Sequence, residues 1–194
     1  MTITTTRAER QARRAFTLVE LLVALTLSGF LLTAVLGTTL YLIRSGMEVA
    51  QYAEMDAQIR RAVDRFGNDV KVATDITWNG SSDITLTLPD ASGGSSTLTY
   101  AWDAASRALY VVPGGSSAAS TGRLYLITDV GTSPDGGAGV SFVRHDRTGA
   151  VATTDAATKR IQIRITVLRH ANPALPPVSS SGAATFILRN KVSS

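Results

Sequence analysis

The 194-residue sequence contains no cysteine and only two histidines, His145 and His170. The lack of cysteine excludes a disulfide framework and any metal site built from thiolates. Two histidines are too few for a histidine-rich metal site. The sequence also has no glycine-rich phosphate loop with its lysine, no HExxH or CxxC pattern and no G-x-S-x-G nucleophile elbow. We therefore expect a protein that is not an enzyme and that uses no cofactor.

Positive charge is concentrated at the N-terminus of the chain. The formal net charge is +4, and residues 1–15 contribute +3 of it through four arginines and one glutamate. The remainder of the chain is therefore nearly neutral. Proteins that bind nucleic acid cluster positive charge over a folded domain. We expect no nucleic-acid partner, because here the excess of positive charge belongs to the first 15 residues.

Residues 16–43 form a run of 28 residues with one charged side chain, Glu20. As an α-helix this run would be roughly 42 Å long, more than the ~30 Å hydrocarbon core of a bilayer. Basic residues precede the run, and only Arg44 follows it directly. The positive-inside rule therefore places residues 1–15 in the cytoplasm and the rest outside. We expect a single-pass protein of the bacterial inner membrane, in contact with lipid, whose C-terminal part is periplasmic.

A secretory signal peptide, a twin-arginine signal and a plain signal anchor each account for only part of this pattern. A secretory signal peptide has an apolar stretch of about 7–15 residues and then a small-residue cleavage site. This run is about twice that length, and no Ala-x-Ala follows it. Arg13 and Arg14 resemble a twin-arginine signal, which the long span and its internal acid fit poorly. A plain signal anchor explains the length and the basic flank but not Glu20.

Glu20 is the informative residue of the span. A charged side chain inside a bilayer costs on the order of 3 kcal/mol by insertion scales, so an acid there is a functional hypothesis. Glu20 lies four residues after Phe16 and hence on the same helical face. Cleavage between Ala15 and Phe16 would create an α-amine, which is mostly protonated because its reference pKa is about 8. Pairing this amine with Glu20 of a neighbouring subunit would fix the axial stagger between subunits.

The segment RAFTLVEL at residues 14–21, with its basic leader and apolar run, resembles the prepilin-type cleavage and methylation signal of type IV pilins and type II secretion pseudopilins. The resemblance implies that prepilin peptidase cuts after Ala15 and N-methylates Phe16. It also implies helix packing with other pilins or pseudopilins, with Glu20 setting the register, and an inner-membrane assembly platform as a partner. The family usually has glycine before the cut, where this chain has Ala15.

Two glycines, Gly29 and Gly37, lie inside the apolar run. Each costs about 1 kcal/mol relative to alanine in a helix. Many major pilins have proline where Gly37 stands, and the resemblance implies a helix that loosens there in filaments. Small residues that allow close packing between helices are an equally good explanation.

After Arg44 the pattern becomes that of an amphipathic helix. Apolar residues recur at three- and four-residue steps at Met55, Ile59, Ala62, Val63, Phe66 and Val70. The opposite face carries pairs of opposite charge, which we interpret as a solvated surface: Asp56 with Arg60, Arg61 with Asp64, and Arg65 with Asp69. One helix is therefore predicted from Phe16 to about Ala73. Its residues 16–43 would form the membrane or filament-core part, and residues 44–74 would pack on a following domain.

From residue 75 the hydrophobic period changes to two, which indicates β-strands. Strands are predicted at residues 83–88, 96–102, 108–112, 123–128, 140–144, 160–168 and 185–188. Turns rich in glycine, serine and proline separate them at residues 91–95, 113–122, 131–139 and 172–182. We predict an α+β fold in which the long N-terminal helix packs on an antiparallel β-sheet head formed by residues 75–194.

The order of these elements resembles the minor pseudopilins of the type II secretion J type and the W-type minor pilins. The segments that carry this resemblance are residues 59–73, 140–146, 160–165 and 186–190. It implies a structural subunit of a type IV pilus or a type II secretion pseudopilus. Two alternatives remain open: a signal-anchored periplasmic binding domain, which would keep Met1, and a minor pilin for DNA uptake or adhesion.

Two further groups of residues in the head, three aspartates and two tryptophans, are candidates for binding sites. Asp129, Asp135 and Asp146 fall in or near predicted loops and could gather around Ca²⁺, although loop aspartates are more often turn formers. We expect no metal site. Trp78 and Trp102 are expected to be partly buried sheet residues, because stacking on sugars or bases would require both to be exposed together.

Overall fold

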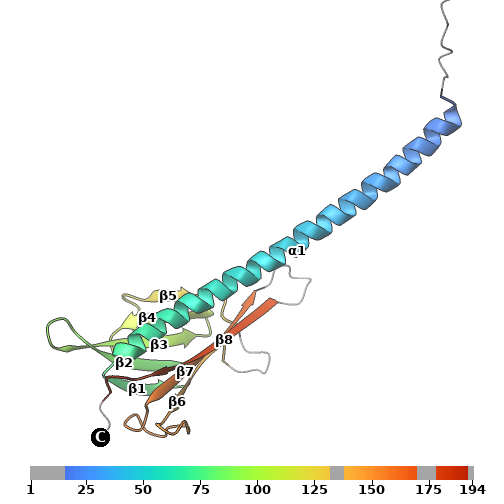
Figure 1. The fold of residues 1–194 in the computed structure, drawn as a ribbon. Helices are drawn as coiled ribbons and strands as arrows, with labels where there is room; N and C mark the ends of the chain where they lie inside the picture. The colour runs from blue at the N-terminus through green and yellow to red at the C-terminus, as the bar shows by residue number, and fades with distance from the viewer. Residues whose placement is uncertain (1–15, 132–137, 170–177, 192–194) are drawn as a thin grey trace, which may run out of the picture. The chain divides into compact units, whose positions relative to one another are not determined.

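The computed structural model describes residues 16–131, 138–169 and 178–191. Ala15 and the rest of the predicted leader, Asp135 and His170 lie outside the described residues. The chain divides into two compact units, Met1–Gly46 and Met47–Ser194, and each is described by itself. Helix α1 (Leu18–Val72) contributes residues to both units (Figure 1).

Helix α1 is 55 residues long and agrees with the helix predicted from residue 16 to 73. Asn190, which is distant in sequence, caps the C-terminal end of the helix. Its Nδ2 donates a hydrogen bond to the carbonyl oxygen of Val72, 3.2 Å away. Lys71 lies in the last turn, where a cation interacts favourably with the helix dipole. The C-terminal end of the helix is therefore held by a polar contact and by charge.

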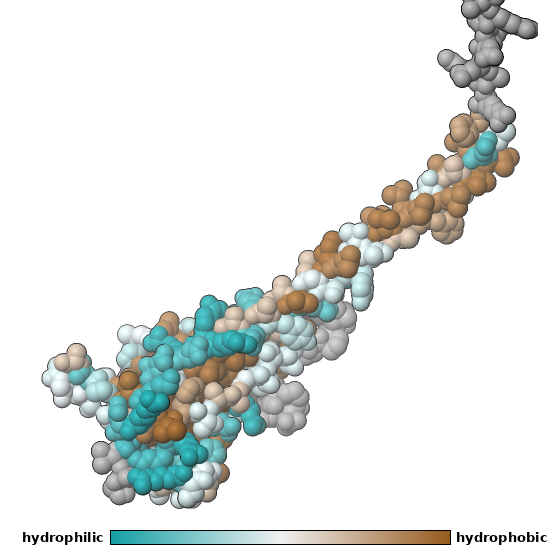
Figure 2. All heavy atoms as spheres, viewed as in Figure 1, coloured by the Kyte–Doolittle hydropathy of each residue, from teal (hydrophilic) through white to brown (hydrophobic). Residues whose placement is uncertain are grey.

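The part of α1 in the first unit is apolar and fully exposed (Figure 2). Among the described residues, α1 is the one helix that is long and apolar enough to cross a membrane. No residue between 16 and 46 is buried by another part of the chain. Such a surface is stable only in lipid or against other apolar helices, because apolar area in water is unfavourable.

The described residues of the second unit form eight strands in two antiparallel sheets (Figure 1). The five-stranded sheet has the order β1-β2-β3-β4-β5 and the three-stranded sheet the order β6-β7-β8. Their bounds are β1 Asp75–Gly80, β2 Asp83–Pro89, β3 Ser95–Asp103, β4 Ala108–Pro113, β5 Leu124–Ile127, β6 Val140–His145, β7 Arg160–Arg169 and β8 Val178–Ile187. The α+β class is thus confirmed, with the antiparallel strands divided between two sheets.

Two strand predictions differ from the structure. Strand β1 was not predicted, and it pairs with β2 from Asp75↔Thr87 onward. Strand β8 begins at Val178, so the turn predicted at residues 172–182 is wrong for its last five residues. This part of β8 is rich in serine, glycine and alanine, a composition typical of turns. Pairing with β7 along its whole length determines its conformation instead.

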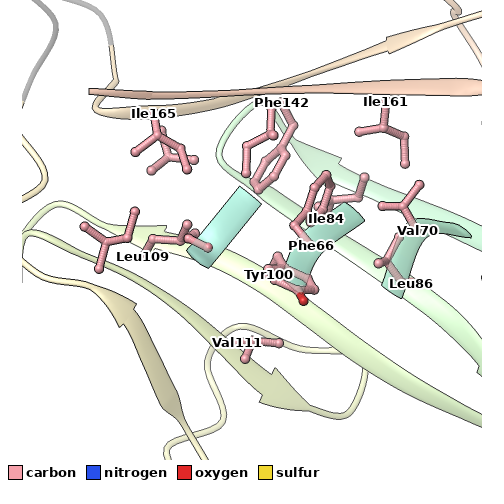
Figure 3. Close-up of a cluster of buried hydrophobic side chains, with 14 of the residues drawn as sticks. Phe66, Val70, Ile84, Leu86, Tyr100, Leu109, Val111, Phe142, Ile161 and Ile165 are labelled. Atoms are coloured by element: carbon pink, nitrogen blue, oxygen red, sulfur yellow. The ribbon is translucent and has the colours of Figure 1, made fainter. Parts of the chain in front are cut away.

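One hydrophobic core lies between the head part of α1 and the two sheets. Phe66 is fully buried, and its ring packs against Tyr100 of β3 at 5.0 Å and Phe142 of β6 at 5.4 Å between centroids (Figure 3). It also packs against Phe186 of β8 at 5.9 Å. The predicted apolar stripe is confirmed: Met55, Ile59, Ala62, Phe66 and Val70 are buried and Val63 packs against the core. Phe66 therefore connects the helix to both sheets.

The two sheets are also joined by backbone hydrogen bonds. The Phe142 N–H donates to the carbonyl oxygen of Ser81, in the β1–β2 turn, at 2.6 Å. After β5 the chain reaches Val130, whose N–H donates to the Arg107 carbonyl at 2.9 Å. Val130 also forms an isolated antiparallel β-bridge with Val167 of β7. The segment that leaves the first sheet thus also pairs with the second.

Candidate processing and assembly site

The helix that carries the predicted site begins with a reciprocal pair of hydrogen bonds. The Glu20 N–H donates to Oγ1 of Thr17 at 3.2 Å, and the Thr17 N–H donates to Oε2 of Glu20 at 3.4 Å. The first bond of the helical ladder also starts here, since the Leu21 N–H donates to the Thr17 carbonyl at 3.1 Å. Thr17 is therefore the N-cap residue and Glu20 the third helical residue of a capping box.

This capping box is a local role for Glu20 that the sequence analysis missed. The Thr-x-x-Glu spacing is a recognised sequence signal for a helix start and could have found it. A carboxylate in the first turn also interacts favourably with the positive end of the helix dipole. A plain membrane anchor can therefore contain Glu20 for capping alone, and an experiment on Glu20 has to separate capping from charge pairing.

Phe16 lies just outside the helix and is 77% exposed. Neither Phe16 nor Thr17 is helical. The bond predicted to be cleaved joins Ala15, outside the described residues, to Phe16. The described side of that bond is therefore accessible and not locked in helical hydrogen bonds. Cleavage and N-methylation at these two residues remain predictions.

Polar side chains within the apolar part of α1 form hydrogen bonds inside the helix. Thr33 Oγ1 donates to the Gly29 carbonyl at 2.7 Å, and three more threonines donate to carbonyls one turn earlier, namely Thr26, Thr38 and Thr39. Hydroxyl groups that bond to their own helix avoid the cost of an unsatisfied donor in lipid. Within residues 16–43 Glu20 is thus distinguished as the one charged side chain.

Gly29 and Gly37 both lie within α1, and their surroundings within the chain are open. A Cβ atom built on either glycine meets no heavy atom within 4 Å. Packing inside the chain therefore requires neither glycine. The two predicted roles, helix loosening and close approach of another helix, remain to be separated in the assembled state.

The candidate calcium residues that the structure describes are engaged in other contacts. Asp129 lies 3.5 Å from Nε of Arg169. Asp146 accepts hydrogen bonds within its own turn, including one of 2.6 Å from Oγ1 of Thr148. That hydroxyl and neighbouring backbone N–H groups hold the pKa of the Asp146 carboxyl below its usual range. Within the described residues no three His, Cys, Asp or Glu side chains come together as a metal site.

The two tryptophans are half-buried and pack against the same core. The guanidinium of Arg144 lies over the Trp78 ring, 5.0 Å from its centroid, and also donates to Asp155 at 2.5 Å. Trp102 lies on β3, opposite Leu109 of β4. Their partial burial agrees with the expected role as sheet residues.

The charged face of the head part of α1 differs in part from the expected pairs. Asp56 and Arg60 form the predicted ion pair at 2.8 Å. Asp69 instead accepts a hydrogen bond of 2.5 Å from the Tyr100 hydroxyl. Burial, together with this carboxylate, raises the pKa of Tyr100 well above its usual range. The helix is therefore joined to β3 by a polar contact that the sequence pattern did not indicate.

Comparison with known families gives a match to the N-terminal segment of the chain. Residues 10–36 match the family model described as the prokaryotic N-terminal methylation motif. The matched range includes the predicted cleavage residues, Glu20 and Gly29. Searches of curated proteins and of solved structures gave no match. The motif supports a type IV pilin-like, membrane-anchored protein that prepilin peptidase processes and that assembles with other pilins.

Proposed function

We propose that this chain is a non-catalytic assembly subunit, a minor pilin or pseudopilin, of a type IV pilus or a type II secretion pseudopilus. The observation that carries the proposal is the position of Glu20. It is the one charged side chain of the exposed apolar run at residues 16–43, and it lies within a prepilin-type processing motif. The head is proposed to face the periplasm and to contact other subunits.

Capping alone satisfies Glu20 incompletely. The Thr17 N–H and the Thr17 hydroxyl both reach Oε2 of Glu20 only at 3.4 Å, and no cation among the described residues forms an ion pair with the carboxylate. In water this is tolerable, because solvent completes the hydration of the charge. In a filament core the water is lost, and an unpaired charge becomes expensive.

Processing would supply the missing cation. Removal of residues 1–15 leaves a positive α-amine on Phe16, and N-methylation preserves its charge. In the filament, this amine of one subunit would lie against Glu20 of its neighbour. A misaligned pair of helices would leave both charges unpaired in an apolar environment, so the pair would select one axial register. Prepilin peptidase and the inner-membrane assembly platform are the partners that this route requires.

The proposal is tested by comparing Glu20→Ala with Glu20→Gln in the full-length chain, expressed together with its assembly machinery. Glutamine at this position retains a capping box but removes the charge, whereas alanine removes both. We expect both variants to insert in the membrane and both to be at least tenfold depleted from purified filaments. Glu48→Gln is the matched control, because Glu48 lies on α1 outside the apolar run.

Normal incorporation of Glu20→Gln alongside failure of Glu20→Ala would show that Glu20 acts by capping the helix, and would contradict the charge-pair mechanism. A mature protein that keeps Met1 would instead favour the signal-anchored binding domain. A minor pilin for DNA uptake or adhesion would share the assembly chemistry and differ in what its head binds.

A further inference from the structure

A groove of about 430 Å³ lies between the head part of α1 and strand β5. The helix contributes Gln58, Arg61, Ala62 and Arg65 to its wall, and β5 contributes the opposite wall together with Thr128. Strand β5 is the last strand of the five-stranded sheet. Among the described residues it has a strand partner only on the β4 side, so the groove borders an open sheet edge.

The open edge has only part of the protection that natural sheets normally give an edge strand. Edges are usually blunted by short length, by bulges, by charged side chains or by proline, and β5 has the first two but not the last two. The sequence of β5, Leu-Tyr-Leu-Ile, has no charge and no proline, and the one irregularity of its ladder is a register shift opposite Leu109 and Tyr110. Leu124 and Tyr125 are 46% and 52% exposed. An apolar, exposed edge of this kind favours pairing with another strand.

The start of β5 is fixed by neighbouring contacts. Arg123 donates from Nε to the Ala119 carbonyl at 2.6 Å and from Nη2 to the Ser117 carbonyl at 2.9 Å. Its guanidinium also lies 4.5 Å from the centroid of the Tyr110 ring. A rigid edge lowers the entropic cost of pairing, because less of the chain has to be ordered when a partner binds.

The polar groups of the groove indicate the chemistry of its occupant. Arg61 and Arg65 line it, and no acidic side chain does. The two arginines therefore favour an occupant that carries a carboxylate. The open edge of β5 favours one with an extended backbone, whose N–H and C=O groups can pair with the strand.

We propose that this groove binds an extended, carboxylate-bearing segment of a neighbouring pilin-like subunit, which adds a strand to β5. Strand addition of this type uses main-chain hydrogen bonds for affinity and side-chain pockets for specificity. The four residues of β5 extend over about 13 Å at 3.3 Å per residue, so a segment of about four residues is enough to cover the edge. The inference rests on the proposed assembly role, which supplies the neighbouring subunit.

The test uses the full-length chain in cells that contain its assembly machinery. A photo-reactive phenylalanine analogue replaces Tyr125, or, as a control, Val151, which is at least as exposed to solvent, at 67% against 52%, but lies outside the groove. After irradiation, mass spectrometry identifies the cross-linked peptide. We expect Tyr125, and not Val151, to cross-link to an extended acidic segment of a pilin-like subunit.

A charge reversal links this cross-link to the groove. Arg61→Glu should reduce the Tyr125 adduct at least tenfold, because it places a negative charge beside the incoming carboxylate. Arg60→Glu is the matched control, since Arg60 is the adjacent residue of the same helix but does not line the groove. It should leave the adduct unchanged.

Several results would overturn the inference. These are the absence of a Tyr125 adduct, an adduct with lipid or nucleic acid, an adduct with a helical or uncharged segment, or equal effects of Arg60→Glu and Arg61→Glu. A result that contradicts strand addition at the groove is distinguishable from one that contradicts the proposed assembly function. If the chain is processed at Phe16 and depends on the Glu20 charge for incorporation, the assembly role stands whatever Tyr125 contacts.

Discussion

Thr17 and Glu20 bond to each other in both directions at the first turn of α1, through Glu20 N–H to Thr17 Oγ1 at 3.2 Å and Thr17 N–H to Glu20 Oε2 at 3.4 Å. This pair starts the helix at Leu18, two residues after the predicted cut. The peptide bond before Phe16 thus stays outside the helix. Glu20 accordingly caps the helix and is also proposed to set the register between subunits, and substitutions at Thr17 test the capping role by itself.

Thr17→Val removes the capping hydroxyl with little change in size. Loss of an N-cap of this type costs about 1 kcal/mol, so the first turn should open about fivefold more often. We expect faster amide hydrogen exchange at Glu20 and Leu21, the two N–H groups that donate to Thr17, in the full-length chain in detergent, with the rest of α1 unchanged. Thr17→Ser keeps the hydroxyl and should exchange at the wild-type rate. Equal exchange in Thr17→Val and wild type would show that the cap does not hold the helix start.

Gly67→Ala tests the contact between α1 and β8. A Cβ atom at residue 67 would lie 2.3 Å from Cε1 of Phe186, so the ring has to move. Overpacking of this type costs about 1–3 kcal/mol, which exceeds the gain of about 1 kcal/mol in helix propensity. Urea unfolding, followed by tryptophan fluorescence, should show a destabilised variant.

The matched experiment places Gly67→Ala in a Phe186→Ala background. There the clash is absent and only the helix propensity remains, so the same substitution should no longer destabilise the head. A Gly67→Ala penalty of the same size in both backgrounds would contradict the packing seen between Gly67 and Phe186.

Glu54 and Arg169 give the head a pH-dependent contact between α1 and β7. Arg169 donates to Oε2 of Glu54 at 2.8 Å, and this hydrogen bond and the arginine charge lower the pKa of Glu54 below its usual 4.5. A lowered pKa in the folded state means that the contact stabilises the fold above pH 4.5 and is lost as the pH falls through the lowered value.

We therefore expect Glu54→Gln to unfold at lower urea concentration than wild type at neutral pH, with the difference closing as the solution is acidified. Glu48→Gln is the control, because Glu48 has no hydrogen-bond or ion-pair partner among the described residues. A difference between Glu54→Gln and wild type that stays constant from neutral to acidic pH would contradict the ion pair.

The sequence was most informative where one period persists over a long segment. The stripe from Met55 to Val70 and the apolar run before it predicted α1 to within two residues at each end, because a buried face has to repeat every three or four residues. Strand β8 was predicted only in part, since its serines and glycine have no strand signal of their own. The division into two sheets depends on contacts distant in sequence, such as Phe142 with Ser81, which no local pattern encodes.

The candidate sites, too, were predicted where a local sequence pattern exists and missed where only tertiary contacts create them. Glu20 and Phe16 were predicted as site residues because an acid in an apolar run is costly and therefore conspicuous. The groove beside β5 was not predicted, because Gln58 and Arg61 meet Leu124 and Tyr125 only through the tertiary fold. Residues on an amphipathic helix indicate which face is solvated, but not which neighbouring strand lies beside that face.

The proposed function depends above all on processing of this chain into a pilin-like subunit with a new charge at its N-terminus. The most direct test is mass spectrometry of the N-terminal peptide of the protein extracted from membranes with active prepilin peptidase. We expect a peptide that begins at Phe16 with a methylated amine. Recovery of the uncut peptide spanning residues 14–21 would contradict it.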